Sequence, residues 1–349
     1  MTPANPANPA TPANASTADN PRIVVLDGHT LTPATPGRPV PGEPSWDRFA
    51  DLGELTVYDR TPPHLVPERV GQARYVLTNK TVLDRPTLDA LPRLEYIGVL
   101  ATGTNVVDLP ACAERGIAVT NVPAYGPDSV AQHTFALLLE LTTRTAAHDQ
   151  AIRQGQWRAR KDFCFTLAPT RELAGKVLAI VGMGAIGRRV ARIGAALGMN
   201  IAATRPRSAD RVSLPGIEIQ WLELDEFFAT ADVLSLHCPL TEETRQMVSA
   251  ARLARMKPDA VLLNTARGGL VDEPALAAAL AAGRPAAAAL DVLTQEPPPD
   301  DHPLLHAPNC LLTPHMAWAT REARLRLMHV AADNLKSYLA GRGVNLVSA

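Results

Sequence analysis

The 349-residue chain lacks the features of several classes of protein. No apolar stretch approaches the roughly 18 residues of a membrane span, and the N-terminus has no basic segment followed by an apolar one. We therefore expect neither a membrane partner nor a secretory signal. The formal net charge is only −1, so the sequence offers no electrostatic footprint for nucleic acid or for an anionic membrane.

Cysteine is scarce as well. The four cysteines, Cys112, Cys164, Cys238 and Cys310, lie far apart and form no C-x-x-C pair. Such spacing is typical of proteins in the reducing cytosol and does not predict a zinc site. We therefore expect a cytoplasmic protein that binds no metal.

Length and composition predict the domain organisation. A chain of 349 residues is long enough for two domains that each bury a core. The first 20 residues are instead rich in proline, alanine, asparagine and threonine. Such a tract cannot bury enough surface to offset the entropy of ordering it, so residues 1–20 are predicted to be a disordered tail.

The strongest motif of the chain is a glycine-rich turn. The apolar run Leu178–Val181 predicts a buried parallel strand, which leads into Gly182-x-Gly184-x-x-Gly187 and then into a helical pattern. In a dinucleotide-binding turn the first glycine permits the tight turn, the second admits a pyrophosphate, and the third lets the helix approach the strand. The helix N-terminus would offer free N–H groups to the phosphates. The alternative is a glycine-rich surface turn.

Short apolar runs alternate with helical patterns along the rest of the chain, which indicates an α/β fold with two doubly wound parallel sheets. A first, flavodoxin-like sheet is predicted from residues 23–26, 55–58, 75–77, 96–99 and 117–119. A second, Rossmann sheet of six strands is predicted from residues 178–181, 201–204, 233–236, 261–264, 287–290 and 311–313. Six strands match the two β-α-β-α-β halves of a dinucleotide-binding domain.

A long helix is predicted between the two sheets, from Ser129 to about Ala147. Ser129 and Gln132 have the spacing of a capping box. The middle of the helix is apolar nearly all round, which indicates burial on more than one side. We expect it to lie in a subunit interface; the alternative is a core helix.

A last helix, from Arg321 to about Ala340, follows the final strand and should pack back on the first domain. Residues 21–125 and 316–349 are therefore assigned to a substrate-binding, catalytic domain. Residues 126–315 are assigned to a dinucleotide-binding Rossmann domain.

Three polar residues follow predicted strands, which is where ligands bind in open α/β sheets. Arg267 lies in a glycine-containing loop, where its guanidinium can hold a carboxylate through two parallel hydrogen bonds. Glu296 ends a proline-rich extended loop, and His315 follows a strand and a proline. Taken singly, each could be a surface or structural residue. Together they supply a carboxylate anchor, an orienting acid and a proton carrier.

These loops and several shorter runs make the chain resemble the D-isomer-specific 2-hydroxyacid dehydrogenases, and within them the glycerate dehydrogenase or hydroxypyruvate reductase branch. The shorter runs are Val24–Gly28, Leu77–Lys80, Ile97–Gly103, Asn121–Tyr125, Ser129–Gln132 and Asp162–Phe165. The spacing of 29 residues from arginine to glutamate and of 19 from glutamate to histidine also suits this family. The resemblance extends from about residue 22 to residue 346.

The resemblance implies a role for each of these residues. Arg267 would bind the substrate carboxylate and polarise the 2-oxo group. His315 would give a proton to the forming alkoxide, while Glu296 would pair with the other imidazole nitrogen and keep the ring protonated for reduction. The carboxylate would also be held by the backbone amides of a loop formed by Leu100, Ala101, Thr102 and Gly103.

The resemblance also implies a nicotinamide dinucleotide as cofactor, held at the predicted strand ends. Thr265 and Asp291 would lie near the nicotinamide and residues 237–239 near the ribose. The full set of expected contacts is Gly182, Gly184, Ala185, Ile186, Gly187, His237, Cys238, Pro239, Thr244, Thr265, Ala266, Asp291 and Ala317.

The end of the second Rossmann strand predicts which dinucleotide is used. In an NAD-specific domain an acid about 20 residues past the glycines accepts a hydrogen bond from the ribose 2′-hydroxyl. Arg205 stands there instead, followed by Arg207 and Ser208, which suit a 2′-phosphate. The sequence therefore predicts a preference for NADP(H) over NAD(H). The alternative is two solvated arginines in a loop.

We expect a homodimeric, cytoplasmic enzyme that reduces hydroxypyruvate or glyoxylate to the D-2-hydroxy acid with NADPH. Two alternatives stay open: an NAD(H)-using D-2-hydroxyacid dehydrogenase for another small acid, and a nucleotide-sensing interaction protein of the corepressor type. Thr104 stands where the branch tends to carry tyrosine, which could loosen the substrate pocket. The sequence leaves open the exact acid, the physiological direction and the purpose of the tail.

Overall fold

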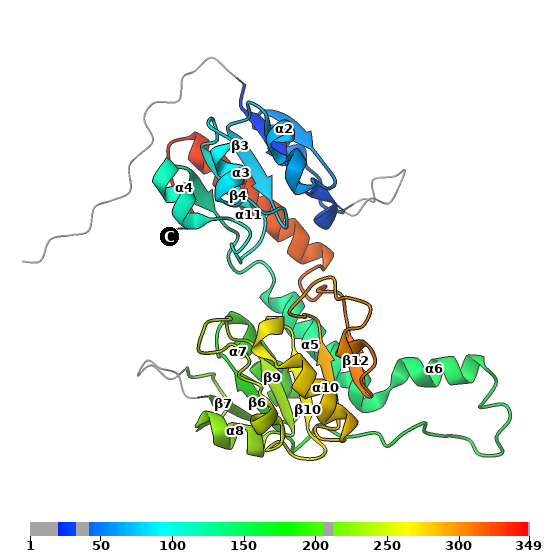
Figure 1. Ribbon diagram of the computed structural model, residues 1–349. Helices are drawn as coiled ribbons and strands as arrows, with labels where there is room; N and C mark the ends of the chain where they lie inside the picture. The colour runs from blue at the N-terminus through cyan, green and yellow to red at the C-terminus, as the bar shows by residue number, and fades with distance from the viewer. Residues whose placement is uncertain (1–19, 33–41, 205–211, 348–349) are drawn as a thin grey trace, which may run out of the picture. The chain divides into compact units, whose positions relative to one another are not determined.

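The computed structural model describes residues 20–32, 42–204 and 212–347. These residues form two compact units (Figure 1). One comprises the described residues as far as Tyr125 together with those from Ala319 on, and the other comprises Gly126–Trp318. The second crossing thus lies three residues beyond the expected boundary at His315. Of the expected tail, residues 1–19 lie outside the described part of the chain.

The first unit holds a five-stranded parallel sheet in the order β2-β1-β3-β4-β5, the flavodoxin-like order. Its strands are β1 (Arg22–Val25), β2 (Glu54–Val57), β3 (Tyr75–Thr78), β4 (Tyr96–Val99) and β5 (Ala118–Thr120). Its helices are α1 (Asp47–Ala50), α2 (Val66–Val70), α3 (Arg85–Asp89), α4 (Leu109–Arg115) and α11 (Arg321–Leu339), with 3₁₀ turns η1 (Gly28–Thr30) and η2 (Pro63–Leu65).

The last helix, α11, packs in this first unit. Its Tyr338 ring lies 4.9 Å from the ring of the fully buried Tyr96 on β4. Asn334 donates from its side-chain amide to the backbone oxygen of Asn121, at 2.9 Å. The sequence placed the helix well because one apolar stripe and a clear C-terminal glycine, Gly341, mark it.

The second unit holds a seven-stranded parallel sheet in the order β12-β11-β10-β9-β6-β7-β8. Its strands are β6 (Val177–Val181), β7 (Asn200–Thr204), β8 (Ile219–Leu222), β9 (Val233–Leu236), β10 (Val261–Asn264), β11 (Ala287–Leu290) and β12 (Cys310–Leu312). Its helices are α5 (Pro127–Thr143), α6 (Thr145–Arg153), α7 (Ala185–Ala196), α8 (Leu224–Thr230), α9 (Ala250–Leu253) and α10 (Glu273–Ala281), with 3₁₀ turns η3 (Gly268–Leu270) and η4 (Pro303–Leu305). The order is that of a Rossmann domain, so the expected fold class is confirmed.

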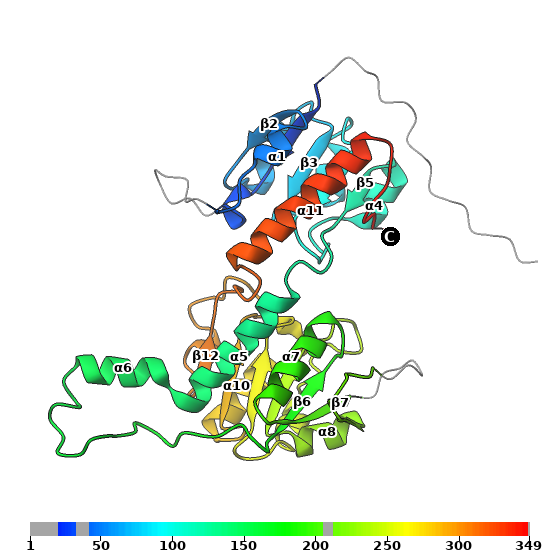
Figure 2. The same cartoon turned by 180° about the vertical axis from the view of Figure 1, so that it is seen from behind.

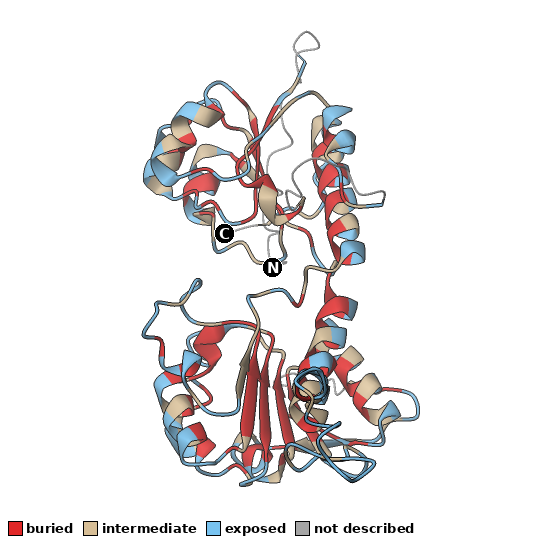
Figure 3. Cartoon of the chain, turned by 90° about the vertical axis from the view of Figure 1, so that its right-hand side faces the viewer, coloured by how far each residue is buried: buried red, intermediate tan, exposed pale blue. Residues whose placement is uncertain are grey.

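The central strand β6 explains why its sequence is apolar without interruption. Leu178 and Ile180 pack with Phe135 of α5 and the residues of α7 on one face. Ala179 and Val181 pack in the core on the other face. Both faces are covered by helices, so alternate residues cannot be polar. Figure 3 shows the buried residues concentrated along the strands in this way.

The expected count of six strands was wrong, because the sequence pattern missed β8. Its four residues, Ile219–Leu222, pair with β7 at the edge of the sheet, and only Leu222 is buried. A short edge strand has neither the continuous apolar run of a central strand nor enough residues for a clear alternation.

The single helix expected from Ser129 to Ala147 was also wrong, because two helices occupy its place. Pro127 stands in the first turn of α5, with Gly126 as N-cap, so Ser129 lies inside the helix and forms no capping box. The helix ends at Thr143, since Arg144 has a φ of 51° in the left-handed region and α6 begins afresh after it. In Figures 1 and 2, α6 and the segment after it extend away from the sheet of their unit.

Candidate active site

The turn between β6 and α7 is shaped for a close-approaching ligand. Gly182 has a φ of 97°, and a Cβ there would lie 2.5 Å from the backbone oxygen of His237. A Cβ on Gly187 would lie 2.0 Å from the oxygen of Gly182, so helix and turn touch backbone to backbone. A Cβ on Gly184 would meet nothing within 4 Å. The turn therefore leaves open space in front of α7.

The N-terminus of α7 faces that space without a side-chain cap. Gly184 is the N-cap residue and supplies no side-chain hydrogen bond to the first turn of the helix. The free N–H groups and the positive end of the helix dipole suit a pyrophosphate. The residues present therefore fit the phosphates of a dinucleotide, which Gly182, Gly184, Ala185, Ile186 and Gly187 would hold.

The other expected cofactor residues follow the strands that neighbour β6. The parallel order β11-β10-β9-β6 brings the carboxyl ends of these strands to one edge of the sheet. Residues 237–239 follow β9, Thr265 and Ala266 follow β10, and Asp291 follows β11. Thr244 donates from its hydroxyl to the backbone oxygen of Pro239, at 2.8 Å. Arg205, Arg207 and Ser208 lie outside the described residues.

His237 directly follows β9. Burial lowers the pKa of its imidazole to about 3. Its Nε2 lies 2.8 Å from the hydroxyl of Ser235, whereas Nδ1 is buried and has no hydrogen-bond partner among the described residues. The contact of His237 with the glycine turn is made by its backbone, which lies against Gly182.

Glu296 and His315 form a direct pair, although 19 residues separate them. Nδ1 of His315 lies 2.6 Å from Oε2 of Glu296, and the side chains are 30% and 34% exposed, respectively. The other oxygen of Glu296 accepts a hydrogen bond from the backbone N–H of Leu293, at 3.0 Å. The carboxylate thus fixes the direction of the ring and leaves Nε2 as the atom that can face a substrate.

Asp291 holds the turn that carries His315. Its side chain is 1% exposed and accepts hydrogen bonds from the backbone N–H of Met316 (2.9 Å) and of Ala317 (2.8 Å). Its own backbone oxygen accepts from the N–H of His315, at 2.8 Å. His315 has a φ of 52°, a conformation that non-glycine residues seldom adopt, and these bonds determine it.

The charge of Asp291 depends on the polar groups around it. Burial raises the pKa of Asp291, but hydrogen bonds from His133, from the Thr313 hydroxyl and from the two backbone amides outweigh it, so the pKa lies below its usual value. Nε2 of His133, on α5, lies 3.0 Å from the Thr313 hydroxyl and 3.5 Å from the carboxylate. The sequence interpretation missed His133, whose signal was a single imidazole within an otherwise apolar helix.

Arg267 lies on the neighbouring loop and is exposed. Its guanidinium donates to the backbone oxygen of Ala266, at 2.7 Å, and none of its hydrogen bonds among the described residues reaches Glu296 or His315. Asn264 shapes this loop by donating to the backbone oxygen of Arg267, at 2.9 Å, and accepting from the N–H of Ala266, at 3.0 Å. The guanidinium is therefore available to an anion while its loop is fixed.

The loop after β4 belongs to the first unit. Its carbonyl groups are engaged: the oxygen of Leu100 accepts from the Asn79 side chain at 2.6 Å, that of Ala101 from the N–H of Val122 at 2.9 Å, and that of Thr102 from Asn121. The amides of residues 101–103 donate to no acceptor among the described residues. The N–H of Leu100 is engaged by the backbone oxygen of Thr78, at 2.8 Å, so of the four expected amides only those of residues 101–103 are available to an anion.

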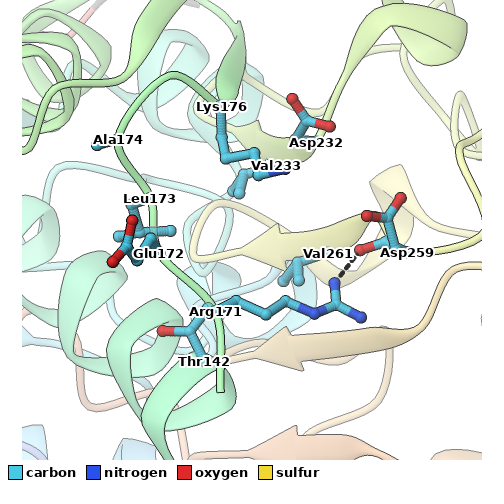
Figure 4. Close-up of a pocket in the computed structure, with 10 residues that line it drawn as sticks. All are labelled: Thr142, Arg171, Glu172, Leu173, Ala174, Lys176, Asp232, Val233, Asp259 and Val261. Atoms are coloured by element: carbon cyan, nitrogen blue, oxygen red, sulfur yellow. Dashed lines mark hydrogen bonds between the residues drawn. The ribbon is translucent and has the colours of Figure 1, made fainter. Parts of the chain in front are cut away.

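A separate pocket of about 490 Å³ lies at the opposite, amino edge of the second sheet (Figure 4). It is lined by residues that precede β6, β9 and β10, among them Lys176, Asp232 and Asp259. Arg171 crosses it and donates to the backbone oxygen of Asp259. The pocket therefore contains none of the expected site residues.

The structure describes residues 20–32, 42–204 and 212–347. Among these, no group of three or more histidine, cysteine or acidic residues could hold a metal ion. No helix within them is long and apolar enough to cross a membrane.

Residues 135–317 match the family model described as "D-isomer specific 2-hydroxyacid dehydrogenase, NAD binding domain". The chain is 42% identical to a hydroxypyruvate reductase of Blautia hydrogenotrophica, over 94% of this chain and 99% of the relative. It is 38% identical to a glycerate dehydrogenase of Methylorubrum extorquens, over 85% and 92% of the two chains.

The structure also resembles a solved NADPH-dependent glyoxylate/hydroxypyruvate reductase of Sinorhizobium meliloti in complex with NADP and malonate. The TM-score is 0.76 at 30% sequence identity, with 94% of this chain and 97% of the other covered.

Proposed function

Because this chain belongs to the D-isomer-specific 2-hydroxyacid dehydrogenase family and is an oxidoreductase of it, we propose that it reduces hydroxypyruvate or glyoxylate to the D-2-hydroxy acid with NADPH. The observation that carries the proposal is the pair of Glu296 and His315, joined at 2.6 Å beside the carboxyl edge of the second sheet. The relatives named above act on the same class of substrate.

In this proposal each residue of the site has a defined role. The guanidinium of Arg267 binds the substrate carboxylate by charge-assisted hydrogen bonds and polarises the 2-oxo group. The unused amides of residues 101–103 support the proposed role of Leu100–Gly103 in binding a carboxylate. When bound, the reduced nicotinamide supplies hydride to the substrate carbon.

His315 is the proton donor in this proposal. Nδ1 is held by Glu296, so Nε2 gives its proton to the oxygen that becomes the hydroxyl group. The carboxylate of Glu296 stabilises the positive ring before the transfer and keeps the ring plane fixed during it. Asp291 keeps the backbone of His315 in its unusual conformation, so Nε2 stays where it is needed.

The preference for NADPH rests on Arg205, Arg207 and Ser208. Each hydrogen bond to a charged group contributes roughly 1.5–3 kcal/mol, so each arginine would shift the preference by about 10- to 100-fold. Arg205→Asp should therefore lower kcat/KM with NADPH far more than with NADH. Equal use of both cofactors by the wild-type protein, or a ratio unchanged in the variant, would leave the NAD(H)-using alternative.

A substrate panel with both cofactors tests the proposal as a whole. NADPH should be consumed with hydroxypyruvate and glyoxylate, and formed again with D-glycerate at higher pH. Binding of the dinucleotide without turnover of any 2-oxo acid would favour the nucleotide-sensing alternative instead.

We also propose a cytoplasmic homodimer joined through α5, α6 and the segment that follows. Most apolar side chains of α5 are buried within its own unit, but the segment after α6 exposes apolar side chains, with Phe163 88% and Trp157 46% accessible. The described cysteines are all free thiols, as a reducing compartment would keep them. A light-scattering mass near the 37.3 kDa of one chain at micromolar concentration would contradict the dimer.

A further inference from the structure

The loop that carries Glu296 runs from β11 to η4, and a buried carboxylate–imidazole pair, Glu273 and His302, is bonded to it. Glu273 is the first residue of α10, and His302 is the N-cap of η4. Each of the two side chains is only 8% exposed. Neither is used by the proposed reaction, and a buried carboxylate is retained at considerable cost unless its oxygens are well bonded.

Both oxygens of Glu273 are bonded to this loop. Oε1 accepts from the backbone N–H of Thr294, at 2.7 Å. Oε2 lies 3.2 Å from Nε2 of His302. The carboxylate therefore joins the middle of the loop to its far end, on either side of Glu296.

The tautomer of His302 follows from its second contact. Its Nδ1 lies 3.3 Å from the backbone N–H of Leu304, which can only donate. Nδ1 is therefore the acceptor and carries no proton, so the proton sits on Nε2 and is donated to Glu273. A neutral His302 satisfies both partners at once.

Two consecutive backbone amides link Glu273 to the catalytic pair. The N–H of Leu293 donates to Oε1 of Glu296, and the next N–H, of Thr294, donates to Glu273. This stretch has little room to shift, since a Cβ on Gly268 would lie 2.0 Å from the backbone carbon of Leu293. Gly268 directly follows Arg267, so the two functional loops touch at this point.

We propose that Glu273 and His302 are positioning residues that set the orientation of Glu296 and, through it, that of the His315 ring. Glu273 holds Thr294, which fixes the direction of the preceding N–H toward Glu296. His302 holds Glu273 in turn. The expected effect on turnover rests on the proposed function, whereas the hydrogen bonds of Glu273 to Thr294 and His302 are present without substrate.

Two substitutions of His302 separate the two contacts of its ring. His302→Asn keeps an acceptor where Nδ1 stands but cannot reach Glu273. His302→Gln keeps a donor where Nε2 stands but loses the bond from Leu304. Glu273→Gln leaves one acceptor oxygen, so the side chain cannot accept from both the Thr294 N–H and the Nε2 proton of His302. Asp301→Asn, an exposed carboxylate next to His302, is the matched control.

We expect kcat for reduction to fall about tenfold in Glu273→Gln and His302→Asn, with the KM values of the 2-oxo acid and NADPH within about twofold. The limb on which reduction falls with rising pH should move to lower pH, as in Glu296→Gln. His302→Gln should lie closer to wild type, and Asp301→Asn should match it. In a Glu296→Gln background, Glu273→Gln should not move the limb further.

A second measurement does not depend on turnover. The imidazole NMR signals of His315 are followed through a pH titration of the cofactor-free protein. Its midpoint should fall in His302→Asn, a variant that leaves the charge of Glu273 in place. An unmoved midpoint in folded His302→Asn and Glu273→Gln would overturn the positioning role, whatever their thermal stability. Absence of reductase activity in the wild-type protein, with the midpoint shift present, would instead contradict only the proposed function.

Discussion

Two buried aspartates, one in each unit, perform the same structural task in different surroundings. Asp27 follows β1 and is 2% exposed; Asp291 follows β11 and is 1% exposed. Asp27 accepts from the backbone N–H groups of Asn79, Lys80 and Thr81 at 2.6–2.8 Å, which fixes the loop after β3. Each aspartate thus shapes a functional loop by collecting backbone donors at the carboxyl edge of a parallel sheet.

The difference lies in what else surrounds the two carboxylates. The remaining donors to Asp27 are the hydroxyls of Thr78 and Thr81, which do not titrate in the physiological range. Asp291 has an imidazole beside it, that of His133, and it holds His315, the proposed proton donor, in a left-handed conformation. The loop proposed to bind the substrate is thus fixed by backbone amides and hydroxyls alone, whereas the carboxylate that fixes the loop of the proposed proton donor also lies beside an imidazole.

The largest effect should come from Asp291→Asn. The carboxylate accepts hydrogen bonds from the N–H groups of Met316 and Ala317. The amide would turn its own N–H₂ toward at least one of them, so the turn of His315 would relax. Because a displacement of about 1 Å at a reacting group can lower the rate about 100-fold, kcat should fall by that order. Steady-state kinetics check this; a kcat within threefold of wild type would contradict the role of Asp291.

Glu296→Gln should have the next largest effect, since it changes the ring partner but leaves the backbone of His315 intact. An amide does not stabilise the positive imidazole, so the proton is lost at lower pH. Reduction at neutral pH should fall roughly 10- to 30-fold, and its descending limb should move to lower pH, while oxidation gains there. A pH profile in both directions measures this, and an unmoved limb would remove Glu296 from the pair.

Asp27→Asn should act on binding rather than on proton transfer. Asn79 donates to the backbone oxygen of Leu100 at 2.6 Å, so a displaced Asn79 would disturb the loop of residues 100–103. We expect KM for the 2-oxo acid to rise about tenfold with kcat nearly unchanged, and the free energy of unfolding to fall by about 2–3 kcal/mol. A fall in kcat with KM constant would break the distinction between the two aspartates.

The smallest effect concerns stability in acid. The folded protein holds the pKa of Asp291 below its usual value, near 3.9, so the carboxylate stabilises the fold above about pH 4 and this contribution is lost as the pH falls through the lowered pKa. Asp291→Asn lacks it at every pH. The difference in unfolding free energy between the two proteins should therefore shrink from about pH 5 to pH 2, as urea denaturation at stepped pH would measure.

The sequence predicted the parts of the fold that rest on local pattern. β6 could be found because both faces of a central parallel strand must be apolar, and the glycine turn because only glycine permits the close approaches at Gly182 and Gly187. β8 could not, since its pairing with β7 depends on the sheet edge rather than on its own four residues. The break at Arg144 could not be found either, because no glycine or proline marks it and Arg144 itself adopts the left-handed φ of 51°.

For the site, the sequence by itself determined which residue types stand at strand ends: Arg267, Glu296 and His315. Only the tertiary structure decided which side chains and backbone groups hold them in place. The 2.6 Å pair of Glu296 and His315, the support of Asp291 by His133 and the attachment of Thr294 to Glu273 all join residues 19 to 158 positions apart. Sequence spacing cannot specify such contacts, because they depend on which strand ends lie next to one another and on backbone groups that every residue carries.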